Sequence, residues 1–88
     1  MKTFRELKSA AQAEAARHGD RIIDPLGVVD GKMVFYALPP GIHEGDIVGL
    51  PEAYWVDVRT GSARPFTNKE CRLLVNKQFL ESAEPMQE

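Results

Sequence analysis

The chain of 88 residues has one cysteine, Cys71, and it has no apolar run as long as the roughly 20 residues that cross a bilayer. A single cysteine cannot close a disulfide within the chain, so a disulfide-stapled secreted fold is excluded. The first residues also lack the apolar segment of a secretory signal peptide. We therefore expect a cytoplasmic protein that does not enter a membrane.

The chain also lacks a strong excess of charge, because 11 basic residues face 13 acidic ones and the formal net charge is −2. A protein that grips nucleic-acid backbone needs a basic face that displaces counterions. The cations available for such a face are scattered along the sequence: Arg5, Lys8, Arg17, Arg59 and Arg64. Nucleic acid is therefore not the expected partner unless these side chains converge on one face.

Motifs for catalysis or for holding a cofactor are missing as well. Gly41, Gly45 and Gly49 are not followed by the Lys-Ser or Lys-Thr of a phosphate-binding loop. The chain has only 2 histidines to serve as a base, and Cys71 lies on an apolar helical stripe, where a cysteine acts as a small hydrophobe. The sequence therefore predicts a protein that is not an enzyme and has no cofactor.

What the chain does contain is the composition of an ordinary globular domain, with 43% hydrophobic and 27% charged residues. A chain of this size supports one compact core. We expect a single domain over residues 1–80. Residues 81–88, which include Pro85 and scattered polar residues, have nothing to bury and are predicted to form a flexible tail.

Residues 53–66 have the clearest pattern in the chain, and it predicts a β-hairpin. Tyr54, Val56 and Val58 alternate onto one face, and Thr60-Gly61 supplies a residue that tolerates positive φ where the strand reverses.

A second hairpin is indicated upstream by Asp30-Gly31, a dipeptide that suits a two-residue turn. It separates residues 20–30, which Pro25 and Gly27 mark as an interrupted edge strand, from the apolar residues 33–38, which predict the most buried strand.

Two helices are predicted from capping boxes. Thr3 with Glu6 opens a helix that runs to about residue 18, and Thr67 with Glu70 opens a short helix that runs to about Leu80. The apolar stripes of the two helices consist of Phe4, Leu7, Ala11 and Ala15 and of Cys71, Leu74, Val75 and Phe79. We therefore predict an α+β fold, with an N-terminal helix and a short C-terminal helix packed on a three- to four-stranded antiparallel meander sheet.

Three aromatic residues, Tyr36, Tyr54 and Trp55, are candidates for a binding surface. Trp55 lies on the otherwise polar side of the hairpin, and exposed aromatic rings often anchor protein interfaces. The alternative is that the C-terminal helix or the loop before the hairpin covers Trp55. The sequence favours this alternative, because a small domain uses its few aromatic residues for its own core first.

Residues 39–52 form a long loop with several prolines and glycines, and it contains His43, Glu44 and Asp46. An imidazole beside two carboxylates suits metal binding or acid–base chemistry. Their spacing matches no metal motif, and a zinc site would need a further His or Cys from elsewhere in the chain. A solvated loop without a metal is therefore favoured, with these three residues as hypothetical contacts for a partner.

The turn from Trp55 to Ser62 reads Trp-Val-Asp-Val-Arg-Thr-Gly-Ser. It resembles the closing hairpin of two kinds of small bacterial module, the immunity protein 35 family and PepSY-type domains. In these modules a helix precedes a three-stranded meander that ends in a hydrophobic-Asp-x-x-Thr-Gly turn. The resemblance implies a protein that binds and neutralises a partner toxin, and it assigns no functional residue because the matched positions serve the turn.

The sequence therefore predicts a small non-enzymatic module that binds a partner protein, and an immunity or inhibitor protein is one version of this function. An alternative of another class is a small metal-dependent protein or enzyme that uses His43, Glu44 and Asp46. Neither the identity of the partner nor the choice between monomer and homodimer follows from the sequence.

Overall fold

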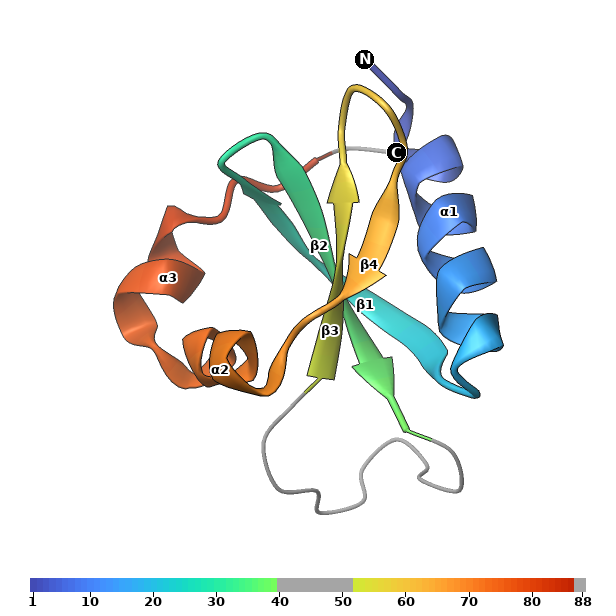
Figure 1. Ribbon diagram of the computed structural model, residues 1–88. Coiled ribbons are helices and arrows are strands. Elements are labelled where there is room, and N and C mark those ends of the chain that lie inside the picture. Colours follow the sequence, from blue (N-terminus) through green and yellow to red (C-terminus); the bar gives the residue numbers. More distant parts are fainter. Residues whose placement is uncertain (40–51, 87–88) are drawn as a thin grey trace.

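The computed structural model describes residues 1–39 and 52–86, and it shows an N-terminal helix, a sheet and a C-terminal run of short helices (Figure 1). Helix α1 spans Phe4–Arg17. The strands are β1 (Arg21–Val29), β2 (Lys32–Leu38), β3 (Glu52–Asp57) and β4 (Ala63–Pro65), and neighbours pair antiparallel in the order β1-β2-β3-β4. The predicted α+β fold with a meander sheet is confirmed, with four strands. None of the described helices is long and apolar enough to cross a membrane.

Helix α1 begins at the predicted capping box. The Thr3 hydroxyl accepts a hydrogen bond from the Glu6 backbone N–H at 3.2 Å, and the Glu6 carboxylate accepts one from the Thr3 backbone N–H at 3.2 Å. These bonds satisfy donors that a helix leaves unpaired at its start. The predicted apolar stripe is buried against the sheet and consists of Phe4, Leu7, Ala11 and Ala15.

Both predicted hairpins are present. The β1–β2 turn places Asp30 at φ 51° and Gly31 at φ 74°, which is the conformation that a two-residue turn of this kind requires. In the β3–β4 turn, the Asp57 carboxylate accepts hydrogen bonds from the backbone N–H groups of Arg59 at 2.8 Å and Thr60 at 3.1 Å. Asp57 thus fixes the reversal of the chain between the two strands.

Strand β1 lies at one edge of the sheet and is interrupted where its proline and glycine predict. Its pairing with β2 shifts register between Ile22 and Pro25 and again between Pro25 and Gly27. Proline removes a backbone donor, and an edge strand tolerates this loss because the outer side of its backbone pairs with no neighbouring strand of the sheet.

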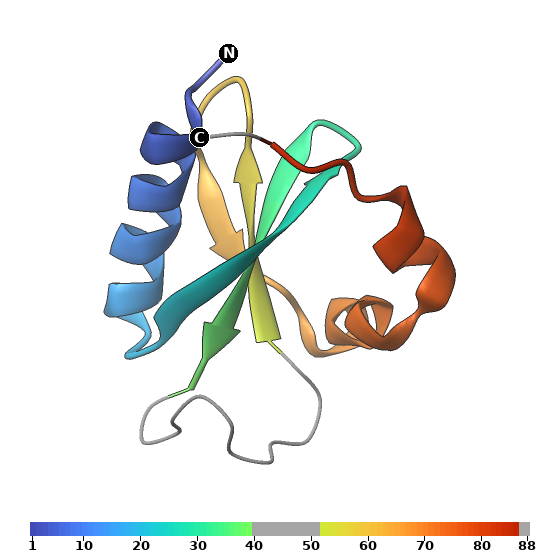
Figure 2. The same cartoon turned by 180° about the vertical axis from the view of Figure 1, so that it is seen from behind.

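Helix α1 and the C-terminal helices cover opposite faces of the sheet, as two opposite views show (Figure 1, Figure 2). The core on the α1 face contains Phe4, Leu7, Ala11, Met33, Phe35, Val56 and Val58. The core on the other face contains Val29, Val34, Ala53, Trp55, Phe66, Cys71 and Leu74. Alternate residues of β2 and β3 therefore serve two cores, which explains why residues 33–38 are apolar on both sides.

The single C-terminal helix predicted from Thr67 to about Leu80 is wrong, because this segment is broken into three pieces. The pieces are α2 (Asn68–Cys71), a 3₁₀ turn η1 (Arg72–Val75) and α3 (Lys77–Ser82). Asn76 separates η1 from α3: its backbone is extended, and its side chain accepts a hydrogen bond from the Phe79 N–H at 3.2 Å, which caps α3. The predicted capping box of Thr67 with Glu70 is confirmed at the start of α2.

The broken helix also changes which side chains face the sheet. Cys71 and Leu74 are buried as their helical spacing predicts, but Val75 is 64% exposed. The residues of a 3₁₀ turn repeat every three positions rather than every 3.6, so the turn rotates Val75 away from the sheet.

The chain beyond α3 is held against β1. Glu84 exchanges two backbone hydrogen bonds with Val28, at 2.7 and 3.0 Å, and Met86 packs against the core on the α1 face. Gly27 permits this approach, because a Cβ there would lie 2.8 Å from the Glu84 carbonyl oxygen. The prediction that this tail has nothing to bury is therefore wrong for residues 81–86.

Candidate functional site

Trp55, one of the predicted contact residues, is covered by the C-terminal part of the chain. Its ring stacks on Phe66 with centroids 4.4 Å apart and meets the ring of Phe79 from α3 edge-on at 6.0 Å. Only 8% of Trp55 is exposed. The interpretation that the C-terminal helix covers this ring is confirmed, and Trp55 presents no open face to a partner.

Two cationic side chains also lie over the Trp55 ring. The Lys32 Nζ lies 5.6 Å and the Arg64 guanidinium carbon 5.9 Å from its ring centroid. Hydrogen bonds from Arg64 are the main cause that lowers the pKa of Glu70, and the indole N–H of Trp55 adds a small effect. That buried N–H nevertheless meets no partner in hydrogen-bond geometry among the described residues. These contacts stabilise the sheet face that the C-terminal helices cover.

Tyr54 lies on the α1 face and is 1% exposed. Its hydroxyl donates a hydrogen bond to the Asp20 Oδ2 at 2.5 Å. Burial first, and then the hydrogen bond and charge of Asp20, raise the pKa of Tyr54, so its hydroxyl stays protonated at neutral pH. Tyr36 is half-buried on the opposite face, and burial raises its pKa too. The three predicted aromatic residues therefore do not form one contact surface.

His43, Glu44 and Asp46 lie outside the described residues, so their role as contacts stays a prediction. The same holds for the alternative function as a metal-dependent protein, which rests on these three residues. Within residues 1–39 and 52–86, no group of three or more His, Cys, Asp or Glu side chains is placed to hold a metal ion.

A small pocket lies where β3 begins and β4 ends, and we call it the acid pocket. It has a volume of about 120 Å³ and is lined by His18, Asp20, Glu52, Ala53, Tyr54, Pro65, Phe66, Asn68 and Cys71. Gly19, at φ 77°, ends α1 and turns the chain into β1, which brings Asp20 to the Tyr54 hydroxyl. Strand β4 pairs with residues 54–56, and the Phe66 N–H bonds to the Ala53 carbonyl, so among the described residues this pairing stops one residue short of Glu52.

The acid pocket is short of positive charge. Burial raises the pKa of Glu52, and the neighbouring charge of Asp20 raises it further. His18 also lines the pocket, and its Nε2 lies 3.0 Å from the Oε2 of Glu14. No Lys or Arg is among the described residues that line the pocket. The described lining residues therefore supply neither Asp20 nor Glu52 with a Lys or Arg partner.

Cys71 lines the same pocket but is not activated as a nucleophile. The residue is 7% exposed. Burial raises the pKa of its thiol, and the charges of Glu52 and Glu70 raise it further. A thiol with a raised pKa is protonated at neutral pH and reacts slowly. Cys71 therefore contributes a protonated thiol to the wall of the pocket.

The sequence offers only an indirect signal for Asp20 and Glu52. Each is a single polar residue at the end of an element, and Asp20 is 34 positions from the tyrosine that it binds. The alternation in residues 53–58 predicts that Tyr54 points inward, and a buried tyrosine hydroxyl usually finds a polar partner. That signal predicts a partner but does not identify it.

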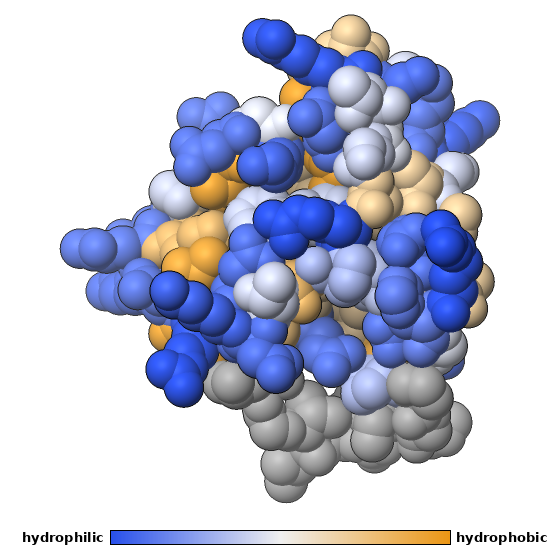
Figure 3. All heavy atoms as spheres, in the orientation of Figure 1, coloured by the Kyte–Doolittle hydropathy of each residue, from blue (hydrophilic) through white to orange (hydrophobic). Residues whose placement is uncertain are grey.

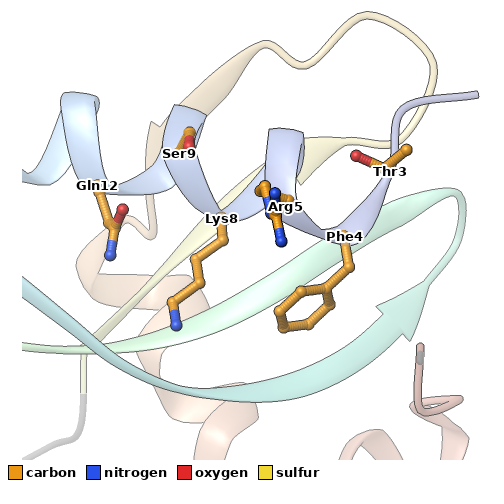
Figure 4. Close-up of a pocket in the computed structure, with 6 residues that line it drawn as sticks. All are labelled: Thr3, Phe4, Arg5, Lys8, Ser9 and Gln12. Atoms are coloured by element: carbon orange, nitrogen blue, oxygen red, sulfur yellow. The ribbon is translucent and has the colours of Figure 1, made fainter. Parts of the chain in front are cut away.

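The five cations considered for nucleic-acid binding are divided among several surfaces. Arg17 and Arg64 each pair with a glutamate, at 3.3 and 2.9 Å, on different elements. Arg59 lies in the β3–β4 turn. Arg5 and Lys8 share one surface on α1 (Figure 4). The described residues thus do not show the convergence that nucleic-acid binding would require.

The face seen in Figure 3 is mainly hydrophilic, and hydrophobic residues show there only in small groups. Among the described residues, the large hydrophobic side chains that are strongly exposed are Met1 and Val75. No broad apolar patch marks an interface on this face. The charged features are therefore the stronger candidates for contact with a partner.

Comparisons of the chain with known protein families, with curated proteins and with solved structures found no match. The resemblance of the hairpin to immunity-protein and PepSY-type modules therefore stays a prediction.

Proposed function

We propose that the protein is a non-enzymatic module that binds a partner protein and receives a basic side chain of that partner in the acid pocket. The observation that supports this proposal is the placement of Asp20 and Glu52 in one partly enclosed pocket with no Lys or Arg among its described lining residues. The raised pKa values of Tyr54 and Cys71 keep both groups protonated. A protonated hydroxyl or thiol is a poor nucleophile, so these values support a binding role rather than a catalytic one.

A basic side chain fits this pocket in charge and in size. Ionised carboxylates only accept hydrogen bonds, and Arg and Lys head groups only donate them. A hydrogen bond to a charged group contributes about 1.5–3 kcal/mol. The pocket of about 120 Å³ has room for a few water molecules at roughly 30 Å³ each, or for one ammonium or guanidinium group in their place.

An immunity or inhibitor role is the version of this function that the hairpin resemblance implies. In this version the partner is a toxin whose Lys or Arg enters the acid pocket. Co-expression with a toxin encoded beside the gene tests it, because protection of the cells should then depend on Asp20 and Glu52.

The general proposal is tested with paired baits. Immobilised wild-type protein and the variant Asp20→Asn/Glu52→Gln are exposed to lysate of the native host, and proteins that distinguish the two baits are identified, purified and titrated. We expect a partner that binds the pocket variant about tenfold or more weakly than it binds the wild type, with an affinity that falls as salt is raised.

The matched control is Asp24→Asn/Asp30→Asn, which removes two exposed carboxylates elsewhere and changes the net charge equally. Circular dichroism confirms that all three proteins are folded. If the control weakens binding as much as the pocket variant does, or if no protein distinguishes the baits, the proposal is wrong.

A further inference from the structure

A depression of about 560 Å³ lies beside the N-terminal half of α1, and we call it the α1 groove. It is lined by Thr3, Phe4, Arg5, Lys8, Ser9 and Gln12. Figure 4 shows the Phe4 and Lys8 side chains extending to the same side of the helix. The groove shares no lining residue with the acid pocket, which lies beyond the other end of the helix.

The α1 groove has two cations and no acid among its described lining residues. The ion pairs found among the described residues use Lys2, Arg17, His18, Arg64 and Lys77 as their basic partners. Arg5 and Lys8 take part in none of them. Residues three apart on a helix are neighbours on its surface, so both head groups can reach one anionic group.

The other lining residues suit a peptide. Ser9 and Gln12 are exposed and continue the surface beyond the two cations with hydroxyl and amide groups, which can bind peptide N–H and C=O groups. Phe4 also lines the groove, but its ring packs edge-on against Phe35 in the core and only 7% of the residue is exposed. A surface with two cations and neutral hydrogen-bonding groups matches a short peptide segment that has a carboxylate and small neighbouring side chains.

We infer that the α1 groove is a docking surface for an acidic segment of a partner protein, with an Asp or Glu carboxylate held between Arg5 and Lys8. A nucleic acid fits less well, because its repeating phosphates need a longer track of cations. Arg17 and Arg64, which would have to extend such a track, are paired with glutamates on other surfaces. This inference goes beyond the proposed function and uses none of the acid-pocket residues.

The test uses the full chain labelled with ¹⁵N and a short, acetylated and amidated peptide of alternating Glu and Ala. We expect saturable shifts at the backbone amides of residues 3–12 and no shifts there with the peptide in which Gln replaces Glu. The variant Arg5→Gln/Lys8→Gln should bind the Glu peptide about tenfold more weakly. The matched control Arg21→Gln/Arg72→Gln, which removes two exposed cations elsewhere, should bind like the wild type.

Three results would overturn the inference. The first is shifts that fall outside residues 3–12, and the second is equal weakening by the two double variants. The third is tighter binding of a short DNA duplex through the same amides, which would assign the groove to nucleic acid. Because Asp20 and Glu52 are intact in every protein used, none of these results bears on the acid pocket.

Discussion

At the scale of single residues, Glu70 connects a helix start to a strand. Its carboxylate caps α2 through the Thr67 N–H at 3.0 Å and accepts two hydrogen bonds from Arg64 of β4, at 2.9 and 3.1 Å. The Arg64 hydrogen bonds are the main cause that lowers the pKa of Glu70 to about 2 from its ordinary 4.5. Because this pKa is lower in the folded protein, ionised Glu70 stabilises the fold above about pH 4.5, and that stabilisation is lost as the pH falls toward 2.

Replacing Glu70 by Gln should therefore destabilise the protein in a pH-dependent way. We expect the free energy of unfolding to fall by about 1 kcal/mol at neutral pH, since Arg64 is half exposed and solvent screens the pair. The loss should shrink as the pH is lowered from 4.5 toward 2, and urea unfolding at a series of pH values measures it.

Glu81→Gln is the control for this substitution. In the wild type, the Glu81 carboxylate lies 3.8 Å from the Lys77 Nζ, and both side chains are exposed. Glu81→Gln should therefore change the free energy of unfolding by no more than about 0.5 kcal/mol. A loss at Glu70 that stays constant over the whole pH range would show that charge is not its cause.

At the scale of elements, the contact between β1 and the segment after α3 depends on one glycine. Gly27→Ala adds a Cβ that would lie 2.8 Å from the Glu84 carbonyl oxygen, at a φ of +141° that side chains rarely adopt. We expect a loss of about 3 kcal/mol in the free energy of unfolding. Amide hydrogen exchange should also accelerate at Val28 and Glu84, whose backbone groups bond to each other.

Gly31→Ala is the control, because it introduces backbone strain without a close contact. Gly31 also has a positive φ, +74°, but an added Cβ there meets nothing within 4 Å. Its substitution should cost only about 1 kcal/mol and leave exchange at Glu84 unchanged. Equal effects of the two substitutions would mean that the approach of Glu84 contributes nothing.

The elements that the sequence predicts well are those fixed by neighbouring residues. Asp30-Gly31 and the Thr3–Glu6 box act over two to four positions, so their outcome can be read locally. The break at Asn76 gives a weaker local signal, because Asn favours a helix cap but an apolar helical spacing continues on both sides of it. Packing of Leu74 and Phe79 against the sheet accompanies the break, and packing depends on the whole chain.

At the scale of the whole molecule, two cores share the strands β2 and β3. Loss of either core exposes one face of both strands, so we expect the two cores to unfold together. Trp55 is the only tryptophan and reports on the face of the C-terminal helices, whereas α1, the longest helix, dominates far-ultraviolet circular dichroism. The urea midpoints from fluorescence and from circular dichroism should therefore coincide.

Leu74→Ala makes this prediction sharper. Leu74 is 4% exposed and packs on the Trp55 face, so its truncation should cost about 2–4 kcal/mol. Both midpoints should move by the same amount, although α1 lies on the other side of the sheet. A fluorescence transition that moves alone would show that the C-terminal helices unfold as a separate unit.

The candidate site could be predicted only in part, because it is a product of the complete fold. The acid pocket takes residues from the end of α1, the start of β3, the end of β4 and both ends of α2. Some of these segments are distant in sequence. The alternating pattern of the hairpin predicts that Tyr54 lies on its inner face, but it does not predict that Asp20 is the partner of the Tyr54 hydroxyl. The aromatic candidates Tyr36 and Trp55 instead belong to the face that the C-terminal helices cover, where a short domain uses large rings to complete its core.

The bridge between Val28 and Glu84 also has a consequence for the timing of folding. It joins the first strand to the last described segment, so the loop that it closes is long. Contacts between residues far apart in the sequence tend to form after local contacts during folding. An interaction absent from the transition state leaves the rate of folding nearly unchanged and slows unfolding. We therefore expect this single pair of backbone hydrogen bonds to act on the lifetime of the folded molecule more than on the speed at which it is reached.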